Sequence, residues 1–321
     1  MKSTILCSAI LCSAILGALS VATTSFAGQA ISDGKSSGKK IIQEPIAPEA
    51  PWVVKFKTSY TWESDFSRGQ QHGASGDSFF KGVEIGHRFA LGTGLPALTD
   101  DGAWYLRIGA NYERWDFGNS GGLPIPNHLQ SAAGIIALEY MIKGQLSFLL
   151  ETQPGVYFED DIRGNNFDSP TKLALAYPIT DNFVIVGGVS YTGLRSIQFI
   201  PILGFSWTIN DKWKVSMIAP EPRVIYTASE NLHLWAGGEL AGGSYRVDER
   251  QTREKKSLNN AVLDYSEWRA GAGFTYKTGN CELELGGGYA FQRKFDYHRA
   301  EEGFETDEGA PYVKFQVTGS F

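Results

Sequence analysis

The sequence predicts an all-β protein, an antiparallel transmembrane β-barrel of about fourteen strands. Three observations lead to this prediction: side chains alternate between apolar and polar, connections alternate between short and long, and aromatic residues gather near the ends of the alternating stretches. The composition agrees, because 37 of the 321 residues are glycine, which is unfavourable inside helices. The formal net charge of −6 argues against a nucleic-acid partner, since no excess of basic residues is present to neutralise phosphates.

The N-terminal segment is typical of an export signal. Lys2 precedes a long uncharged apolar stretch, and small residues stand three and one positions before a cut after Ala27. We therefore predict a signal peptide over residues 1–27, in preference to an uncleaved anchor helix. Residues 28–51 are rich in Gly, Ser and Lys, contain three prolines and show no apolar period, so we expect a flexible periplasmic leader. A plug or a partner-binding tail is the alternative for this leader.

The body of the chain, residues 52–321, alternates from its first residue onward. Successive side chains of a β-strand point to opposite faces, so this period of two predicts strands. They lie near residues 52–62, 79–91, 103–117, 129–142, 145–158, 171–180, 183–192, 196–209, 212–219, 222–228, 232–247, 263–277, 281–297 and 311–321. The strands near 212–219 and 222–228 are short and are separated by Pro220 and Pro222. A folded-in loop at that point would reduce the count to twelve.

The connections between these strands predict which kind of β-protein this is. Tight turns such as Asp181-Asn182 alternate with longer polar loops, which we expect over residues 64–77, 118–128, 160–169, 248–260 and 298–309. Short turns at one end and long loops at the other are typical of outer-membrane barrels. The aromatic residues near strand ends suit a membrane interface: they are Trp52, Trp62, Trp104, Tyr112, Trp207, Trp213, Trp268 and Tyr276. A soluble β-sandwich would alternate too, but without such girdles.

Strand parity places charged side chains of both signs on the inner face. These are Glu84, Arg88, Arg107, Glu113, Glu139, Glu151, Arg223, Glu239, Glu267 and Arg269. An Arg or Lys facing lipid at mid-bilayer costs roughly 2–4 kcal/mol, so inward placement follows. The mixed signs favour a paired network that fills the lumen. A selectivity ring or ligand site is the functional hypothesis, and its candidate residues are Arg107, Arg223, Glu239, Glu267 and Arg269.

The C-terminal residues and one internal stretch resemble known barrel proteins. Phe315, Val317 and Phe321 fit the alternating C-terminal signal that the barrel assembly machinery recognises. The stretch from Ile200 to Val247, together with DYSEWRAG at 264–271, resembles an uncharacterised family of bacterial outer-membrane barrels of unknown function, over most of residues 52–321. A looser likeness to MltA-interacting, OmpV-like barrels rests on the region from Pro201 to Tyr226. These resemblances imply a fold and an outer-membrane location, and neither implies a catalytic activity.

No motif in the sequence points to catalysis. The five histidines are scattered, no GxSxG is present, and no His–carboxylate or Cys cluster has the spacing of a metal site. We therefore predict no catalytic residue, no metal and no cofactor. The favoured function is a narrow pore or transporter for small solutes. The alternative is a structural or envelope-interaction barrel with a plugged lumen, and an outer-membrane lipid-modifying enzyme is the least favoured hypothesis. The expected partners are outer-membrane lipid, the assembly machinery and small solutes.

Overall fold

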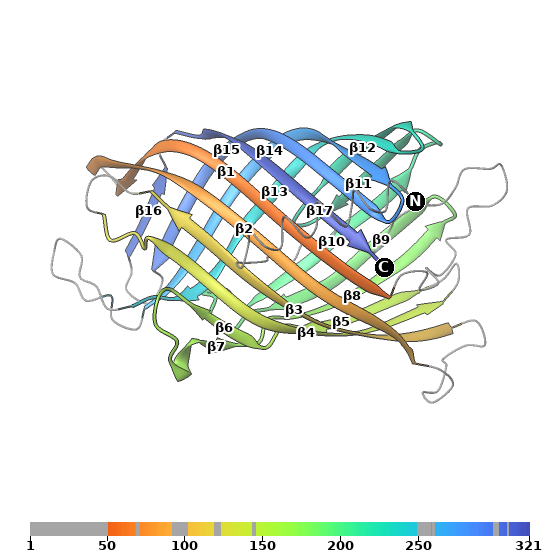
Figure 1. Ribbon diagram of the computed structural model, residues 1–321, viewed down its shortest axis with the longest axis horizontal. Coiled ribbons are helices and arrows are strands. Elements are labelled where there is room, and N and C mark those ends of the chain that lie inside the picture. The colour runs from red at the N-terminus through yellow and green to blue at the C-terminus, as the bar shows by residue number, and fades with distance from the viewer. Residues whose placement is uncertain are drawn as a thin grey trace.

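The computed structural model describes residues 51–68, 71–91, 102–118, 123–142, 146–248, 258, 261–297, 302–306 and 308–321. Within these residues one β-sheet closes on itself into a barrel (Figure 1). The signal peptide expected over residues 1–27, the leader up to residue 50 and most of the 248–260 loop lie outside the described residues. The described part of the chain contains no helix that is long and apolar enough to cross a membrane.

Seventeen strand segments form fourteen barrel strands. Eleven of the fourteen are single segments: β1 (Trp52–Arg68), β2 (Gln71–Leu91), β3 (Gly102–Phe117), β4 (His128–Ile142), β9 (Phe183–Tyr191), β10 (Phe199–Thr208), β11 (Trp213–Ile218), β12 (Arg223–Ser229), β13 (Leu232–Arg246), β14 (Val262–Thr278) and β15 (Cys281–Tyr297). The other three are interrupted: β5 (Ser147–Thr152) with β6 (Gly155–Phe158), β7 (Phe167–Asp168) with β8 (Thr171–Thr180), and β16 (Glu302–Thr306) with β17 (Ala310–Ser320). β5 with β6, and β16 with β17, each pair with the same two neighbouring strands along their length, whereas β8 pairs with β5 and β9 and the short β7 pairs with β6 alone. The predicted count of fourteen, with β11 and β12 as true strands, is therefore confirmed for the described chain.

The two ends of the described chain close the barrel. β1 pairs with β2 on one side and with β17 on the other, in a register that runs from Val53 opposite Ser320 to Thr61 opposite Tyr312. The Trp52 amide donates to the Phe321 carbonyl at 3.0 Å, and the Phe321 amide donates back at 2.9 Å. We call the end that holds these residues the short-turn end, and the opposite end the long-loop end.

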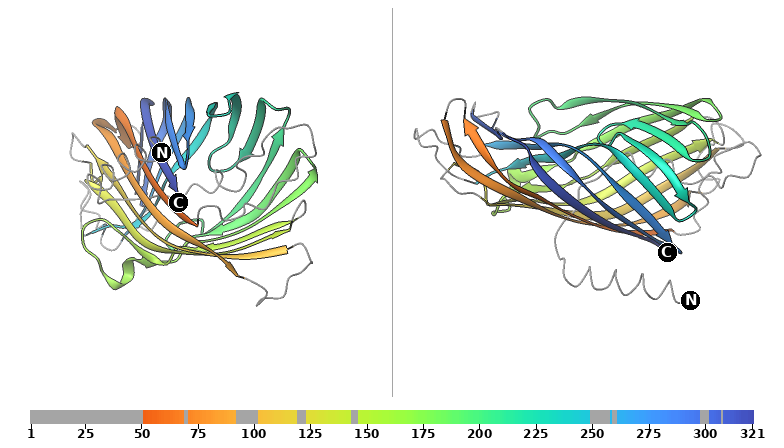
Figure 2. Two further views of the ribbon diagram at one scale, coloured as in Figure 1. Left: turned by 45° about the vertical axis from the view of Figure 1, so that its right-hand side comes forward. Right: turned by 90° about the horizontal axis from the view of Figure 1, so that it is seen from above.

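The outer surface of the wall is apolar. Large exposed side chains there include Ile85, Ile108, Ile136, Leu173, Ile185, Leu203, Leu234, Leu285 and Val313. Of the predicted girdle aromatics, Trp52, Trp62, Trp207, Trp213, Trp268 and Tyr276 are exposed. The views from the side and from above show this wall as a tilted, twisted cylinder (Figure 2).

Three connections differ from their predictions: the expected loops 160–169 and 298–309 contain β7 and β16, and the third is the connection between β1 and β2. Residues 64–77, expected to be a polar loop, extend β1 and β2 nearly to their turn. The ladder tolerates the polar sequence through register shifts between Thr61 and Ser64 and between Phe66 and Ser67. A β-bulge of this kind bends a strand without ending its pairing, and a sequence period alone does not reveal it.

The apolar outer surface predicts an asymmetric response to a new charge. Ile136, in the middle of β4, is 48% exposed, and Ile162, in the β6–β7 connection, is 65% exposed. We expect Ile136→Arg to lower the free energy of unfolding by roughly 2–4 kcal/mol, because the guanidinium enters hydrocarbon. The matched Ile162→Arg should change it by less than about 0.5 kcal/mol. Urea unfolding in phospholipid vesicles measures both, and equal effects would contradict burial of this surface in lipid.

Candidate functional site

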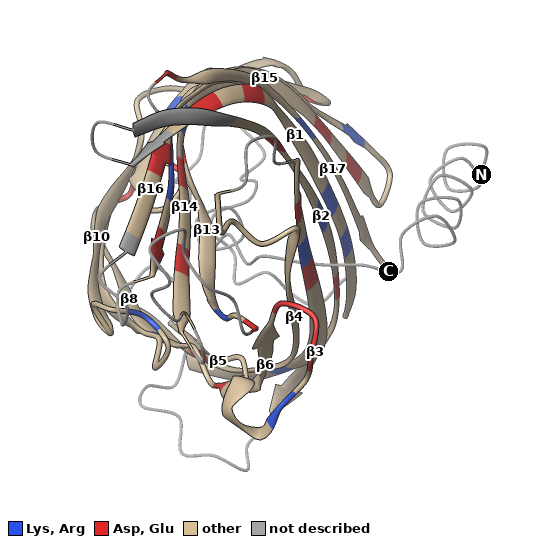
Figure 3. Ribbon diagram, turned by 90° about the vertical axis from the view of Figure 1, so that its left-hand side faces the viewer, with Lys and Arg blue, Asp and Glu red and all other residues tan. Residues whose placement is uncertain are grey.

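Charged residues of both signs occur along several strands of the barrel wall (Figure 3), and their side chains point into the barrel interior. The contacts themselves establish this direction, because they join strands that are not neighbours in the sheet. Arg223 on β12 donates from Nη1 to Oε2 of Glu284 on β15 at 2.9 Å, with β13 and β14 between them. Thr61 on β1 likewise donates to Glu267 on β14 at 3.2 Å. Such contacts are possible only across the inside of the wall.

Four of the five predicted candidates belong to one connected network. Arg269 contacts Glu267 at 2.5 Å and Glu239 at 3.8 Å, and Lys314 contacts Glu239 at 2.8 Å. Lys314 also contacts Glu284 at 3.4 Å, which pairs with Arg223, and Arg223 contacts Glu221 at 2.7 Å. We call these seven residues (Glu221, Arg223, Glu239, Glu267, Arg269, Glu284 and Lys314) the acid–base chain. It runs along the inner face from β12 to β17.

The Glu267–Arg269 pair is the most deeply buried part of this chain. Glu267 has no exposed surface, and it accepts hydrogen bonds from Ser78 at 2.6 Å, Thr61 at 3.2 Å and the Tyr265 hydroxyl. Arg269 donates to Ser59 at 3.2 Å. Removing two charges from water is unfavourable unless further hydrogen bonds satisfy both partners. Strands β1, β2 and β14 supply those hydrogen bonds, so the pair ties together strands that are not neighbours in the sheet.

The fifth candidate, Arg107, lies in a separate network on the facing wall. Its guanidinium contacts Glu84 and Glu139, each at 3.5 Å, and also Glu151. Lys55 contacts Glu84 at 3.2 Å, which extends this group to β1. Arg107 therefore sits among β2–β5 and does not contact the acid–base chain in the described residues.

Sequence reasoning missed Glu221, which precedes β12, and two central members of the acid–base chain that lie on strands, Glu284 and Lys314. Strand parity held the signal for both. Glu284 precedes the exposed Leu285, and Lys314 follows the exposed Val313, so both side chains point inward. What parity could not reveal is their connection, because Lys314 and Glu239 are 75 residues apart in sequence.

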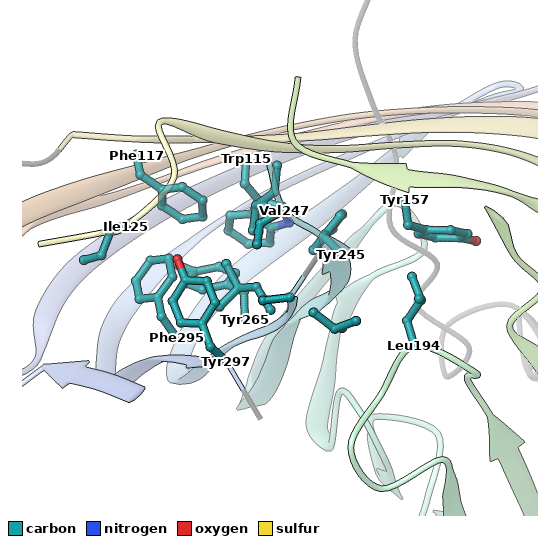
Figure 4. Close-up of a cluster of buried hydrophobic side chains, with 14 of the residues drawn as sticks. Trp115, Phe117, Ile125, Tyr157, Leu194, Tyr245, Val247, Tyr265, Phe295 and Tyr297 are labelled. Carbon is teal, nitrogen blue, oxygen red and sulfur yellow. The ribbon is translucent and has the colours of Figure 1, made fainter. Parts of the chain in front are cut away.

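An aromatic cluster lies at the long-loop side of this chain and joins opposite walls (Figure 4). Trp115 on β3 meets Tyr265 on β14 with ring centroids 5.0 Å apart, and Phe117 on β3 meets Phe295 on β15 at 5.0 Å. The hydroxyl of Tyr245 on β13 donates to Glu113 on β3 at 3.2 Å. The cluster therefore crosses the interior and narrows any path along the barrel axis.

A cavity of about 590 Å³ lies between the cluster and the acid–base chain. Its lining includes Trp115, Tyr157 and Tyr245 from the cluster, and Glu221, Glu239, Arg269, Glu284 and Lys314 from the chain. The neighbouring inner wall is apolar, since Val186, Ile202 and Ile218 pack together there. The cavity thus has a charged side and an apolar side, a combination suited to small-molecule binding.

The predicted assembly residues lie at the closing strand. Val317 on β17 is buried and packs against Val54, Leu283 and Phe315. Phe321 follows β17 and is partly exposed. All three belong to the segment whose pairing with β1 completes the barrel.

A family model matches residues 46–317, and its description is Domain of unknown function (DUF6268). The chain belongs to this DUF6268 family. The resemblance to an uncharacterised barrel family is thereby confirmed, and the looser likeness to MltA-interacting, OmpV-like barrels stays a prediction. A search of curated proteins finds no match to the chain.

Several solved structures share the barrel architecture at low similarity. The toluene transporter TodX of Pseudomonas putida is 11% identical, with 86% of this chain and 90% of that chain covered and a TM-score of 0.43. The translocator domain of autotransporter NalP from Neisseria meningitidis is 11% identical, at 84% and 88% coverage and a TM-score of 0.35. LpxR from Salmonella typhimurium is 12% identical, at 84% and 100% coverage and a TM-score of 0.36. All three scores are below 0.5, so none of these structures informs the function of this DUF6268 protein.

Burial of the Glu267–Arg269 pair predicts a large effect of removing one partner. We expect Glu267→Ala to lower the free energy of unfolding by about 3–5 kcal/mol, because it leaves Arg269 buried without its carboxylate. The matched Asp116→Ala removes the half-exposed Lys81–Asp116 pair, whose atoms are 2.8 Å apart, and should cost less than about 1 kcal/mol. Denaturant unfolding compares the two variants. The double variant Glu267→Ala/Arg269→Ala should recover part of the loss, and an additive double variant would contradict the coupling.

Proposed function

We propose that this protein is an outer-membrane barrel that passes small solutes and has no catalytic site. The observation that carries this proposal is the 590 Å³ cavity inside the wall, lined on one side by Glu239, Arg269 and Lys314. A rigid wall with charges held in place by one another gives a solute a fixed polar surface along its path. The five predicted candidates, Arg107 included, are in this proposal the groups that determine which solutes pass.

Two features support an outer-membrane location with lipid as the surrounding partner. The outer face of the wall carries exposed apolar side chains, while the buried ion pairs face inward. This arrangement reverses that of a soluble protein, and it suits a sheet with lipid outside. The alternating Phe315, Val317 and Phe321 support recognition of the last strand by the barrel assembly machinery.

The described histidines support a barrel without catalysis. His87 stacks against Trp52 and Phe89 on the outer face, with ring centroids 4.6 and 4.2 Å away. His128 contacts Asp160 at 2.8 Å, and His233 contacts Thr227 at 3.3 Å. Within the described chain, these contacts give no nucleophile–base–carboxylate arrangement of the kind that acyl transfer needs.

The aromatic cluster favours the second candidate function, a structural or envelope-interaction barrel with a plugged lumen. Rings from β3, β14 and β15 meet across the interior, and well-packed aromatic contacts resist opening. A barrel of this kind would present its loops to partners and conduct nothing along its axis. The two functions therefore differ in one measurable property, which is conductance.

Planar-bilayer recordings of the wild type, Trp115→Ala and Arg269→Ala test the proposal. We expect a small wild-type conductance and a several-fold larger one for Trp115→Ala, because the substitution removes a ring that crosses the lumen. Arg269→Ala should shift the reversal potential in a salt gradient toward cation selectivity, because Glu239 and Glu267 lose a positive partner. Ile162→Ala, in an exposed connection, is the matched control and should behave as the wild type. Absence of conductance in all four proteins would contradict solute passage along the barrel axis and support an axially plugged barrel.

A further inference from the structure

The barrel wall is low at one place, the β11–β12 hairpin. β11 has six residues and β12 seven, whereas β13 next to them has fifteen. β10 pairs with β11 only from Gly204 to Thr208, although β10 itself begins at Phe199. A strand needs about 9–11 residues to cross a bilayer. The hairpin is therefore too short to form the full height of the wall.

The ladder on the β13 side ends at a matching level. Regular pairing of β12 with β13 stops at Gly237, and two further bonds follow, in which Gly238 N donates to Pro222 O and Leu240 N to Pro220 O, each at 2.9 Å. Beyond Leu240, the next strand partner of β13 on this side in the described chain is Phe158 of β6, which lies opposite Arg246. We call the gap between residues 199–203 of β10 and residues 241–245 of β13 the side port.

Proline stands at the edges of the side port. Thr208 donates to Asn182 O and Thr192 donates to Gln198 O, so the even-numbered residues of β10 exchange hydrogen bonds with β9. The nitrogen of Pro201 is therefore directed toward the side port, where a proline leaves no donor unpaired. Pro220 and Pro222 form the turn at the base of the port. The edge of β10 that faces the side port is unpaired, and the proline at position 201 removes one backbone donor that this edge would otherwise expose.

The cavity extends through this gap in the wall. Its lining includes Leu203 of β10 and Met217 of β11, which lie beside the gap, together with Ile202 on the inner face. Neighbours in a strand point to opposite faces, and here Ile202 is 8% exposed while Leu203 is 72% exposed. Met217 is 36% exposed, so a cavity that contacts Ile202, Leu203 and Met217 reaches from the inside of the barrel to its outer surface at the gap. The charged interior and the apolar outer surface are therefore continuous at this point.

The chemistry of the side port indicates an amphipathic anion. Ile200, Met217 and Leu240 make its edges apolar, and Phe199 and Leu203 on the outer face beside it are among the most exposed apolar residues. Arg195, in the β9–β10 connection, also lines the cavity and forms no ion pair within the described chain, although Asp168 and Asp264 accept hydrogen bonds from the amides of Leu194 and Ser196 on either side of it. Arg269 and Lys314, by contrast, are already paired. An apolar body would occupy the port while an anionic head contacts Arg195.

We propose that the side port is a lateral passage through which small amphipathic anions with an apolar chain exchange between the lipid phase and the cavity. This inference rests on the proposed transport function and names its substrate class and route. It also accounts for the aromatic cluster, because a solute that passes through the wall does not need an open axis at the long-loop end.

Uptake of decyl sulfate into phospholipid vesicles that contain the full mature protein tests this route. The sulfate stays ionised, so unassisted crossing is slow, and an albumin wash removes the probe from the outer leaflet. Ala219→Trp places a ring at the base of the port and should abolish most of the uptake. The matched Ala228→Trp lies at the other end of the same hairpin, is also exposed, and should leave uptake unchanged. Equal unfolding midpoints in urea establish that both variants fold.

The anionic head is tested separately. Arg195→Gln should slow decyl sulfate uptake by about tenfold, the effect of losing one hydrogen bond to a charged group, and should leave decyltrimethylammonium uptake unchanged. Uptake by Ala219→Trp equal to wild type would overturn the side port but not solute passage. Ionic conductance in bilayers without decyl sulfate uptake would likewise overturn the side port but not solute passage. Absence of both would overturn the port and the proposed function together.

Discussion

The pairing of β1 with both β2 and β17 is the interaction on which the rest of this structure depends. It joins residues 53–61 to residues 312–320, more than 250 positions away in sequence, and the reciprocal bonds between Trp52 and Phe321 complete it. Without this ladder the sheet would have two long free edges, and unpaired backbone groups cost several kcal/mol each in an apolar medium. Closure also separates an inner face of the sheet from an outer face, so the parity of a residue in its strand decides whether its side chain points into the barrel or away from it.

Once the sheet is closed, two kinds of side chain, charged and aromatic, fill its interior. Charged residues of β12–β17 form the acid–base chain, in which Lys314 contacts Glu239 and Glu284 from two other strands. Aromatic residues such as Trp115 and Tyr265 pack nearer the long-loop end. Both groups tie non-adjacent strands together, and both restrict the lumen. The cavity between them is what remains for a ligand, and its two sides differ in polarity.

The side port interrupts the backbone pairing that closes the rest of the barrel, and the residues at its edges are suited to an unpaired edge. Pro201 has no amide hydrogen to leave unpaired, and Pro220 and Pro222 end the hairpin before it reaches the full height of the wall. Gly242 on β13 has a φ of +129°, and a Cβ there would lie 2.1 Å from the Tyr265 carbonyl oxygen. A side chain at this edge would therefore collide with β14, which explains a glycine at this position. A wall with an opening thus needs residues different from those of a continuous ladder.

The sequence by itself determined most of the strands and the face to which their side chains point, because a period of two is a local property of the backbone, but it left the strand number open between twelve and fourteen. It also identified Arg223, Glu239, Glu267 and Arg269 as inward charges, and their positions in the acid–base chain agree with that parity. Only the tertiary structure decided which charges meet, that Arg107 belongs to a different network, and that the wall is open above β11 and β12. Those outcomes depend on register and strand height around a closed barrel, and these are set by contacts between residues distant in sequence rather than by any local pattern.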